Sequence, residues 1–278
     1  MAAIDEVWLA ALTKDDDDAG SQNRFNLTVN IDGADVFRHD FLLGWNLPGQ
    51  GPAGLRDGQT GLQKASPAAP FESAGVTNAS IRLGLRGDDA WGPKHVLVIG
   101  RGQPGFTPGR FAALAMETEI ERWLSADSDE GRLTMPVRRV GSGDSNTVIR
   151  RVLLLVYTDR AKDVDTDSDI KLQIAASGQI MLDHKIAHDL RRVRAYWHYL
   201  PVERPFTRAD ILTKGGIQLQ ILGTDAWLPA TVFVFGLDTE EGRPREVVTL
   251  SAIPHWGLGW LSTDPSEGVA SVSLPVSN

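Results

Sequence analysis

The sequence predicts an all-β chain that folds as two tandem antiparallel β-sandwich domains related by internal duplication. A segment of nine residues occurs twice, as WLSADSDEG at 123–131 and as WLSTDPSEG at 260–268, with six identical positions. Short runs in which apolar and polar residues alternate are separated by turn residues, which is typical of strands with one buried face. The amphipathic helices that a parallel α/β protein needs between its strands are missing. A β-sandwich in each half is therefore favoured.

The duplication extends well beyond this segment. AWGPKHVLVIG at 90–100 aligns with AWLPATVFVFG at 226–236. Upstream, IRLGLRG at 81–87 aligns with IQLQILG at 217–223. Internal similarity at a fixed period indicates a repeated structural unit, and here the unit is far longer than a solenoid repeat.

The offset between the copies shows where they differ in length. It is 145 residues between Thr13 and Thr158, and 136 residues between Trp91 and Trp227. The first copy therefore carries about nine extra residues (145 minus 136) in its middle. A period near 140 residues is the size of a domain.

These lengths predict two domains, each long enough to bury a core of its own. We expect the first β-sandwich at 1–140 and the second at 147–278. Residues 141–146 read Gly-Ser-Gly-Asp-Ser-Asn, a composition typical of linkers.

In the first copy, apolar runs and alternating patterns predict most of the strands. They are expected at 7–12, 25–31, 81–85, 95–99 and 133–137. Residues 44–75 are rich in glycine and proline and show no periodicity, so a long loop is expected there. Residues 111–123 have apolar residues at spacings that suit a short helix, although the matching part of copy two contains Pro254, which disfavours one.

In the second copy the same patterns recur. Strands are expected at 152–157, 170–174, 217–222 and 231–235. Residues 158–169 form an acidic loop after the first of these strands. Residues 183–199 are polar and aromatic, and no regular element is predicted for them.

Composition and charge exclude several classes of function. The chain has 278 residues, a net charge of −8 and no cysteine. The acidic balance argues against a general nucleic-acid binder. Disulfides, thiolate metal sites and cysteine nucleophiles are excluded. No signal peptide and no apolar run as long as a membrane span is visible, so a cytoplasmic location is the default expectation.

Short motifs in both copies resemble the PLAT domain, also called the lipoxygenase-homology domain. In copy two the matching residues are Thr158, Asp159, Thr166, Asp167, 169–174, Gly178, 189–190, 226–227 and 232–236. In copy one they are Thr13, 18–20, 25–31, Gly33, 40–41 and 90–91. The resemblance implies an eight-stranded sandwich that docks on lipid surfaces or partner proteins, often through calcium held in loops at one end, and that is not catalytic alone.

Acidic loops follow the first strand of each copy and suggest where calcium would bind. Calcium prefers six to eight oxygen ligands, and a loop dense in carboxylates supplies several. The spacing is not that of an EF-hand, because its sixth and twelfth positions would be Ser168 and Ile174. By the resemblance, the loop before each tryptophan strand would contribute as well, through Asp88 and Asp89 in copy one and Asp225 in copy two. The expected ligands are Asp15, Asp17, Asp18 and Asp88 in copy one, and Asp159, Asp163, Asp165, Asp167 and Asp225 in copy two. The alternative is a solvated acidic turn that binds no ion.

Four aromatic residues are candidates for contact with a membrane or a protein partner. They are Trp45, Trp197, Tyr199 and Trp256, which lie in segments without a clear strand pattern. Exposed aromatic groups of this kind mark interaction surfaces. The alternative is that they fold back over the sandwich. In contrast, Trp91 and Trp227 recur in both copies and are expected in the cores.

The sequence contains no nucleophile motif and no phosphate-binding loop. We therefore expect a non-enzymatic binding or assembly module that docks on a membrane or a protein partner through its loops. Two linked modules would bind with added avidity. The alternatives are a structural or adaptor subunit that needs no metal, and a hydrolase that acts on lipid or polysaccharide.

Overall fold

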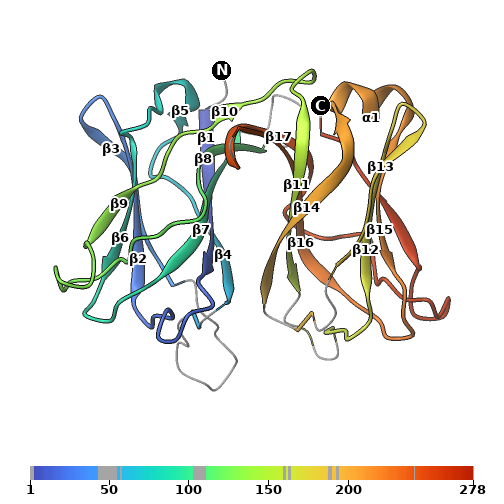
Figure 1. Ribbon diagram of the computed structural model, residues 1–278, viewed down its shortest axis with the longest axis horizontal. Helices are drawn as coiled ribbons and strands as arrows, with labels where there is room; N and C mark the ends of the chain where they lie inside the picture. The colour runs from blue at the N-terminus through green and yellow to red at the C-terminus, as the bar shows by residue number, and fades with distance from the viewer. Residues whose placement is uncertain are drawn as a thin grey trace. The chain divides into compact units, whose positions relative to one another are not determined.

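The computed structural model describes residues 3–42, 55–56, 58–102, 111–158, 161, 164–186, 190–191, 194–240 and 242–277. The chain divides into two compact units, Met1–Ser142 and Gly143–Asn278. The boundary falls within the segment 141–146, in which Asp144 and Asn146 form a hydrogen-bonded turn with Thr147. Each unit is built from two facing sheets (Figure 1).

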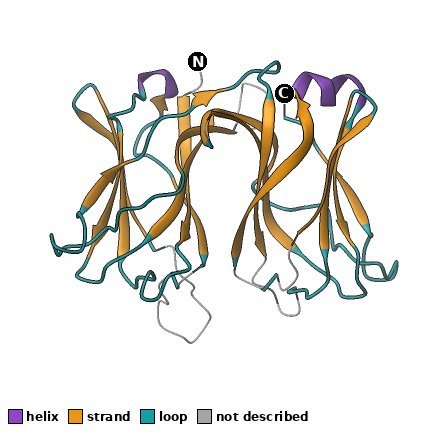
Figure 2. Ribbon diagram, in the orientation of Figure 1, coloured by secondary structure: helices purple, strands orange, loops and turns teal. Residues whose placement is uncertain are grey.

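Strands make up nearly all of the regular structure, which confirms the expected all-β class (Figure 2). In the described part of the chain, the only helices are the short α1 (Arg208–Lys214) and the 3₁₀ turn η1 (Ser73–Gly75). Thr207 caps α1 by accepting a hydrogen bond from the backbone N–H of Asp210. Neither of these helices is long and apolar enough to span a membrane.

Unit 1 has two antiparallel sheets with the orders β4-β1-β7-β8 and β3-β2-β6-β9. A two-residue strand, β5, pairs with the start of β1. The strands are β1 (Ala3–Thr13), β2 (Arg24–Ile31), β3 (Ala34–Phe41), β4 (Thr60–Ala65), β5 (Phe71–Glu72), β6 (Ile81–Arg86), β7 (Pro93–Gly102), β8 (Phe111–Glu117), β9 (Thr134–Pro136) and β10 (Gly141–Ser142).

Unit 2 has sheets with the orders β14-β11-β16-β17 and β13-β12-β15-β18. When the strands that form the two sheets are counted from the start of each unit, β5 and β10 apart, both units have the orders 4-1-6-7 and 3-2-5-8. The strands are β11 (Ile149–Thr158), β12 (Ile170–Ala176), β13 (Gln179–Ile186), β14 (Ala195–Phe206), β15 (Gly216–Ile221), β16 (Pro229–Glu240), β17 (Arg243–Ile253) and β18 (Ser271–Leu274).

The core of unit 1 lies between its two sheets and contains Trp91, which is fully buried. The indole ring packs edge-on against Phe25, with ring centroids 4.4 Å apart. Its Nε1–H donates a hydrogen bond of 3.0 Å to Oγ1 of Thr13, which is also fully buried. This bond removes the cost of burying the polar end of the ring.

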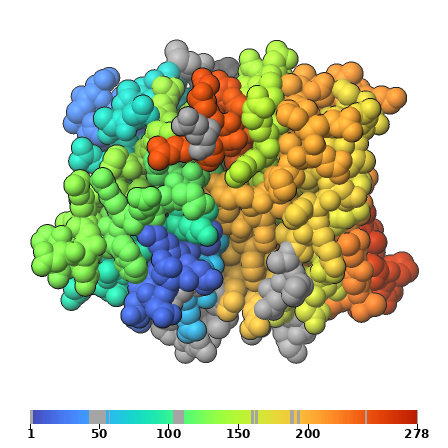
Figure 3. Space-filling model, viewed as in Figure 1, coloured from blue at the N-terminus to red at the C-terminus, as the bar shows by residue number. Residues whose placement is uncertain are grey.

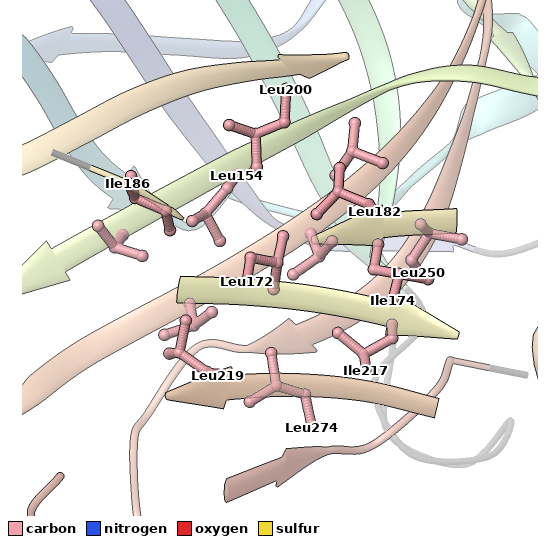
Figure 4. Packing of buried hydrophobic residues seen from close by; sticks show 14 of the residues in the cluster. Leu154, Leu172, Ile174, Leu182, Ile186, Leu200, Ile217, Leu219, Leu250 and Leu274 are labelled. Carbon is pink, nitrogen blue, oxygen red and sulfur yellow. The ribbon is translucent and has the colours of Figure 1, made fainter. Parts of the chain in front are cut away.

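The core of unit 2 repeats this arrangement around Trp227. The Nε1–H of Trp227 donates a hydrogen bond of 3.1 Å to Oγ1 of Thr158, and both residues are fully buried. Leucine and isoleucine side chains from both sheets fill the space between them (Figure 4). Strand β12 alternates regularly between buried and half-buried residues, as the sequence predicts.

Two expectations about unit 1 are wrong. Residues 111–117 form strand β8, not a helix, because they pair with β7 along the sheet. Alanine, leucine and methionine favour helices locally, but pairing with a neighbouring strand overrides that preference. The long loop expected at 44–75 contains β4 and β5, which pair with β1.

Candidate functional site

The repeated nine-residue segment folds into a closed loop in unit 1. The hydroxyl of Ser125 donates to Oε2 of Glu130 at 3.0 Å and accepts from the backbone N–H of Asp127 at 3.0 Å. The carboxylate of Asp127 in turn accepts from the N–H of Asp129. Leu124 and Trp91 exchange backbone hydrogen bonds, so the loop is fastened to the core tryptophan.

The copy in unit 2 makes the same contacts. Ser262 donates to Oε2 of Glu267 at 3.1 Å and accepts from the N–H of Asp264 at 3.0 Å. Leu261 and Trp227 exchange backbone hydrogen bonds. The residues that are identical in the two copies of the segment therefore form the same hydrogen-bonded loop in both units.

The glycine that closes each loop is required by a close backbone approach. A β-carbon on Gly131 would lie 2.4 Å from the carbonyl oxygen of Trp123, and one on Gly268 would lie 2.3 Å from that of Trp260. Neither contact is tolerated, since the atoms approached are backbone atoms. The loop holds Trp123 half-buried.

In unit 1 this loop forms one wall of an open cavity of about 530 Å³. The loop after β1 and the loop between β6 and β7 supply the remaining walls. The lining residues are Asp18, Asp88, Asp89, Ala90, Trp123 and Glu130. The loop after β1 lies on the molecular surface, where it is dark blue in Figure 3. We call this cavity the acidic pocket.

The four carboxylates of the acidic pocket differ in their surroundings. Asp89 accepts a hydrogen bond from the backbone N–H of Gln22 at 2.9 Å, and Glu130 accepts from Ser125. Asp18 and Asp88 are exposed, and their carboxylates have no hydrogen-bond or ion-pair partner among the described residues. Asp18 also adopts a positive φ of 65°, a conformation that aspartate tolerates better than most residues. Two carboxylates are thus fixed in place and two are free to meet a ligand.

Trp123 gives the acidic pocket an aromatic wall. The Nζ of Lys14 lies 5.7 Å from the centroid of the Trp123 ring and donates to the carbonyl oxygen of Glu121. The ring therefore already attracts one ammonium group, as expected from the negative electrostatic potential of an indole face. Carboxylates and an indole together are the groups that recognise a positively charged organic group.

The residues expected to bind calcium are divided among several places. Asp18 and Asp88 line the acidic pocket, whereas Asp15 and Asp17 are exposed neighbours that do not line it. Within the described ranges, no group of three or more His, Asp or Glu side chains is arranged to hold a metal ion.

In unit 2 the carboxylate of Asp225 is engaged by the backbone. Its oxygens accept hydrogen bonds from the N–H groups of Asp167 and Ala226, at 3.2 and 3.0 Å. Asp165 and Asp167 are exposed. Asp159 and Asp163 lie outside the described residues. The contact from Asp167 to Asp225 corresponds to the one from Gln22 to Asp89 in unit 1, so this position stabilises a loop in both units.

Among the described residues, the expected aromatic contact residues lie in two different settings, a strand and a loop. Trp197 and Tyr199 lie within strand β14, not in an irregular segment, and Trp197 is only 8% exposed. The expectation that these two residues lie outside a strand is wrong, because β14 pairs with β11 along this stretch. Their role in contact with a partner stays a prediction. Trp256 lies in a loop, packs against the core of unit 2 and donates to the carbonyl oxygen of Gly259 at 2.7 Å. Trp45 lies outside the described residues.

Comparison with known proteins gives no relative. No family model, no curated protein and no solved structure matches the chain. The resemblance to the PLAT domain therefore stays a prediction.

The acidic pocket includes Trp123 and Glu130, which were not predicted as site residues. The repeat itself was the available signal, because Trp123 and Glu130 are identical in both copies. Their place beside Asp18 and Asp88 depends on how the loops meet, which the linear sequence does not contain.

Proposed function

We propose that the chain is a non-enzymatic binding module whose acidic pocket in unit 1 receives a positively charged group of a partner, such as a lysine or arginine side chain. The observation that carries the proposal is the combination in one cavity of four carboxylates with an accessible indole ring. An ammonium or guanidinium group beside an indole at a solvent-exposed site gains about 0.5–1 kcal/mol. Carboxylates around it add charge-assisted hydrogen bonds.

The shape of the pocket favours an organic cation over calcium. Calcium needs six to eight oxygen atoms at about 2.3–2.6 Å, and so requires carboxylates that converge on one point. A side chain with an extended charged end suits a larger cavity with carboxylates spread over its walls. Calcium-dependent docking on a lipid surface, which the sequence suggests, becomes the alternative outcome of the test below.

We also infer that the two units descend from one duplicated module. The common strand order, the same tryptophan-to-threonine hydrogen bond and the same closed loop support this inference. At the pocket the two copies differ, because Asp88 of unit 1 corresponds to Thr224 of unit 2. Unit 1 is the more acidic at this place, which supports assigning the binding role to it.

The double variant Asp18→Asn with Asp88→Asn should weaken binding of a tetralysine peptide by roughly tenfold or more, because it removes the two unpaired carboxylates. Isothermal titration calorimetry of the full chain at low ionic strength measures this change. The same titration with calcium chloride tests the metal alternative.

The matched control is Asp165→Asn with Asp167→Asn, which removes the same charge from the corresponding loop of unit 2. It should leave peptide affinity close to that of the wild type. Equal losses in both double variants would mean that only overall charge matters, and the proposal would be withdrawn. A different result would favour the metal. If the wild type binds calcium but not the peptide, and the Asp18→Asn, Asp88→Asn variant no longer binds calcium, the ligand of the pocket is calcium and not an organic cation.

A further inference from the structure

Unit 1 carries a second charged surface, of opposite sign, on the outer face of the sheet β3-β2-β6-β9. Residues that alternate with the core residues of these strands point away from the core. Four of them are exposed arginines: Arg24 on β2, Arg38 on β3, and Arg82 and Arg86 on β6. We call this surface the arginine face.

The register of the sheet places these arginines close together. Thr28 on β2 is paired with Arg38 on one side and with Arg82 on the other. Neighbouring strands are about 4.8 Å apart, so the Cα atoms of these two arginines are roughly 10 Å apart. Arg24 and Arg86 are direct partners across β2 and β6. Like charges directly opposite each other destabilise a sheet, so folding alone does not favour this pair.

Most of this positive charge is not neutralised within the unit. Asp40 forms an ion pair with Arg86 at 3.2 Å and accepts a hydrogen bond from Asn26. Asp35 accepts a hydrogen bond from Asn30 near the turn between β2 and β3. In the described portion of the chain, no ion pair involves Arg24, Arg38 or Arg82. Their guanidinium groups are therefore available to an external anion.

The corresponding face of unit 2 is built differently. Lys171 on β12 forms an ion pair with Asp183 on β13 at 3.0 Å, and Lys185 forms one with Asp169. The positions that correspond to Arg82 and Arg86 are Gln218 and Leu222. On this face of unit 2, both lysines are therefore paired with an aspartate. Unpaired arginines are a property of unit 1 and not a requirement of the fold.

We propose that the arginine face docks unit 1 on an anionic phospholipid surface. The arginines are spread over a broad sheet face of three strands, which matches a two-dimensional array of phosphate groups. Guanidinium groups bind phosphate oxygens in a bidentate manner. The net charge of −8 does not prevent this, because exposed charges are screened beyond about 8 Å at physiological ionic strength.

A linear polyanion suits this surface less well. Proteins that bind single-stranded nucleic acid use a groove lined by aromatic rings on which the bases stack. The outward-facing residues of β2 and β6 are Arg24, Asn26, Thr28, Asn30, Arg82, Gly84 and Arg86, none of them aromatic. We therefore expect the arginine face to recognise the phosphate groups of its anionic partner and not nucleic-acid bases.

Cosedimentation with phosphatidylcholine vesicles that contain phosphatidylserine tests the proposal. The full chain should bind these vesicles at about 0.1 M salt, where the rest of its negative charge is screened beyond about 10 Å. It should lose binding as more salt is added and should not bind pure phosphatidylcholine vesicles. Each basic residue near an anionic leaflet strengthens binding on the order of fivefold. The double variant Arg38→Gln with Arg82→Gln should therefore bind roughly 25-fold more weakly, and Arg24→Gln alone roughly fivefold more weakly.

The control is Lys171→Gln with Lys185→Gln, which changes the net charge by the same amount on the corresponding face of unit 2. It should bind vesicles like the wild type, and circular dichroism should show that all variants are folded. Absence of binding to anionic vesicles at about 0.1 M salt would overturn the proposal. Equal losses of vesicle binding in the two double variants would also overturn it. The same holds if the chain binds a heparin fragment or a DNA oligomer but does not bind vesicles. These residues are separate from the acidic pocket, so failure of one proposal leaves the other standing.

Discussion

Trp227→Ala should lower the free energy of unfolding of unit 2 by about 3–5 kcal/mol. Trp227 is fully buried and among the largest side chains in the core. Truncation removes its apolar contacts and leaves a cavity that the two sheets cannot close completely. Urea unfolding followed by circular dichroism measures the change. Trp91→Ala should have an effect of similar size in unit 1, and a loss below about 1 kcal/mol in either unit would contradict the placement of these rings.

A double-mutant cycle isolates the hydrogen bond between Trp227 and Thr158. Thr158→Val alone leaves the indole N–H buried without an acceptor, which should cost about 1–3 kcal/mol. Trp227→Phe alone removes the donor. Because the 3.1 Å bond couples the two groups, the double variant should lose less stability than the two single variants together. Strict additivity would mean that the two groups do not interact.

Acidification from pH 7 to pH 4.5 should destabilise both units. Burial lowers the pKa of His95 in unit 1 from 6.5 to about 4, with a smaller contribution from Lys94. Burial likewise lowers the pKa of His198 in unit 2 to about 4, with a further contribution from His184. The folded state therefore takes up a proton less readily than the unfolded chain. The stability associated with each neutral ring is fully present above pH 6.5 and is lost as the pH falls towards 4.

His198→Phe should reduce the loss of stability in this pH range. The ring of His198 is stacked with that of Tyr196, and its buried Nε2 has no hydrogen-bond partner within the described residues. A phenyl ring preserves the stacking and does not titrate. The variant should gain up to about 3 kcal/mol relative to the wild type at pH 4.5, and little at pH 7.5. Urea midpoints measured at several pH values provide the comparison, and parallel pH profiles for the two proteins would contradict the assigned pKa.

The fold was predictable where sequence patterns are local. Strands such as β2 and β12 alternate between buried and more exposed residues, so their period of two is visible directly. Strand β8 was not predictable in this way. Six of its seven residues are Phe, Ala, Leu or Met, so apolar and polar residues do not alternate along it. Strand β14 was missed because its aromatic and polar residues suggest a surface loop. Only its pairing with β11 identifies it as a strand.

The candidate site was predictable in part for the same reason. The density of aspartates marks Asp18 and Asp88 as members of acidic loops without any knowledge of the structure. The role of Glu130 requires the closed loop in which Ser125 holds it, and that of Asp89 requires its contact with Gln22. The arginine face was not predicted at all. Its residues are four or more positions apart in sequence and meet only through the register of β2, β3 and β6.

A crystal structure of the full chain grown with a tetralysine peptide would test the binding role of unit 1 most directly. We expect a lysine side chain beside Trp123, with its ammonium group within hydrogen-bond distance of Asp18 or Asp88, and no peptide at the corresponding loops of unit 2. A peptide bound at unit 2 instead, or a pocket filled by a calcium ion that excludes the peptide, would contradict this account.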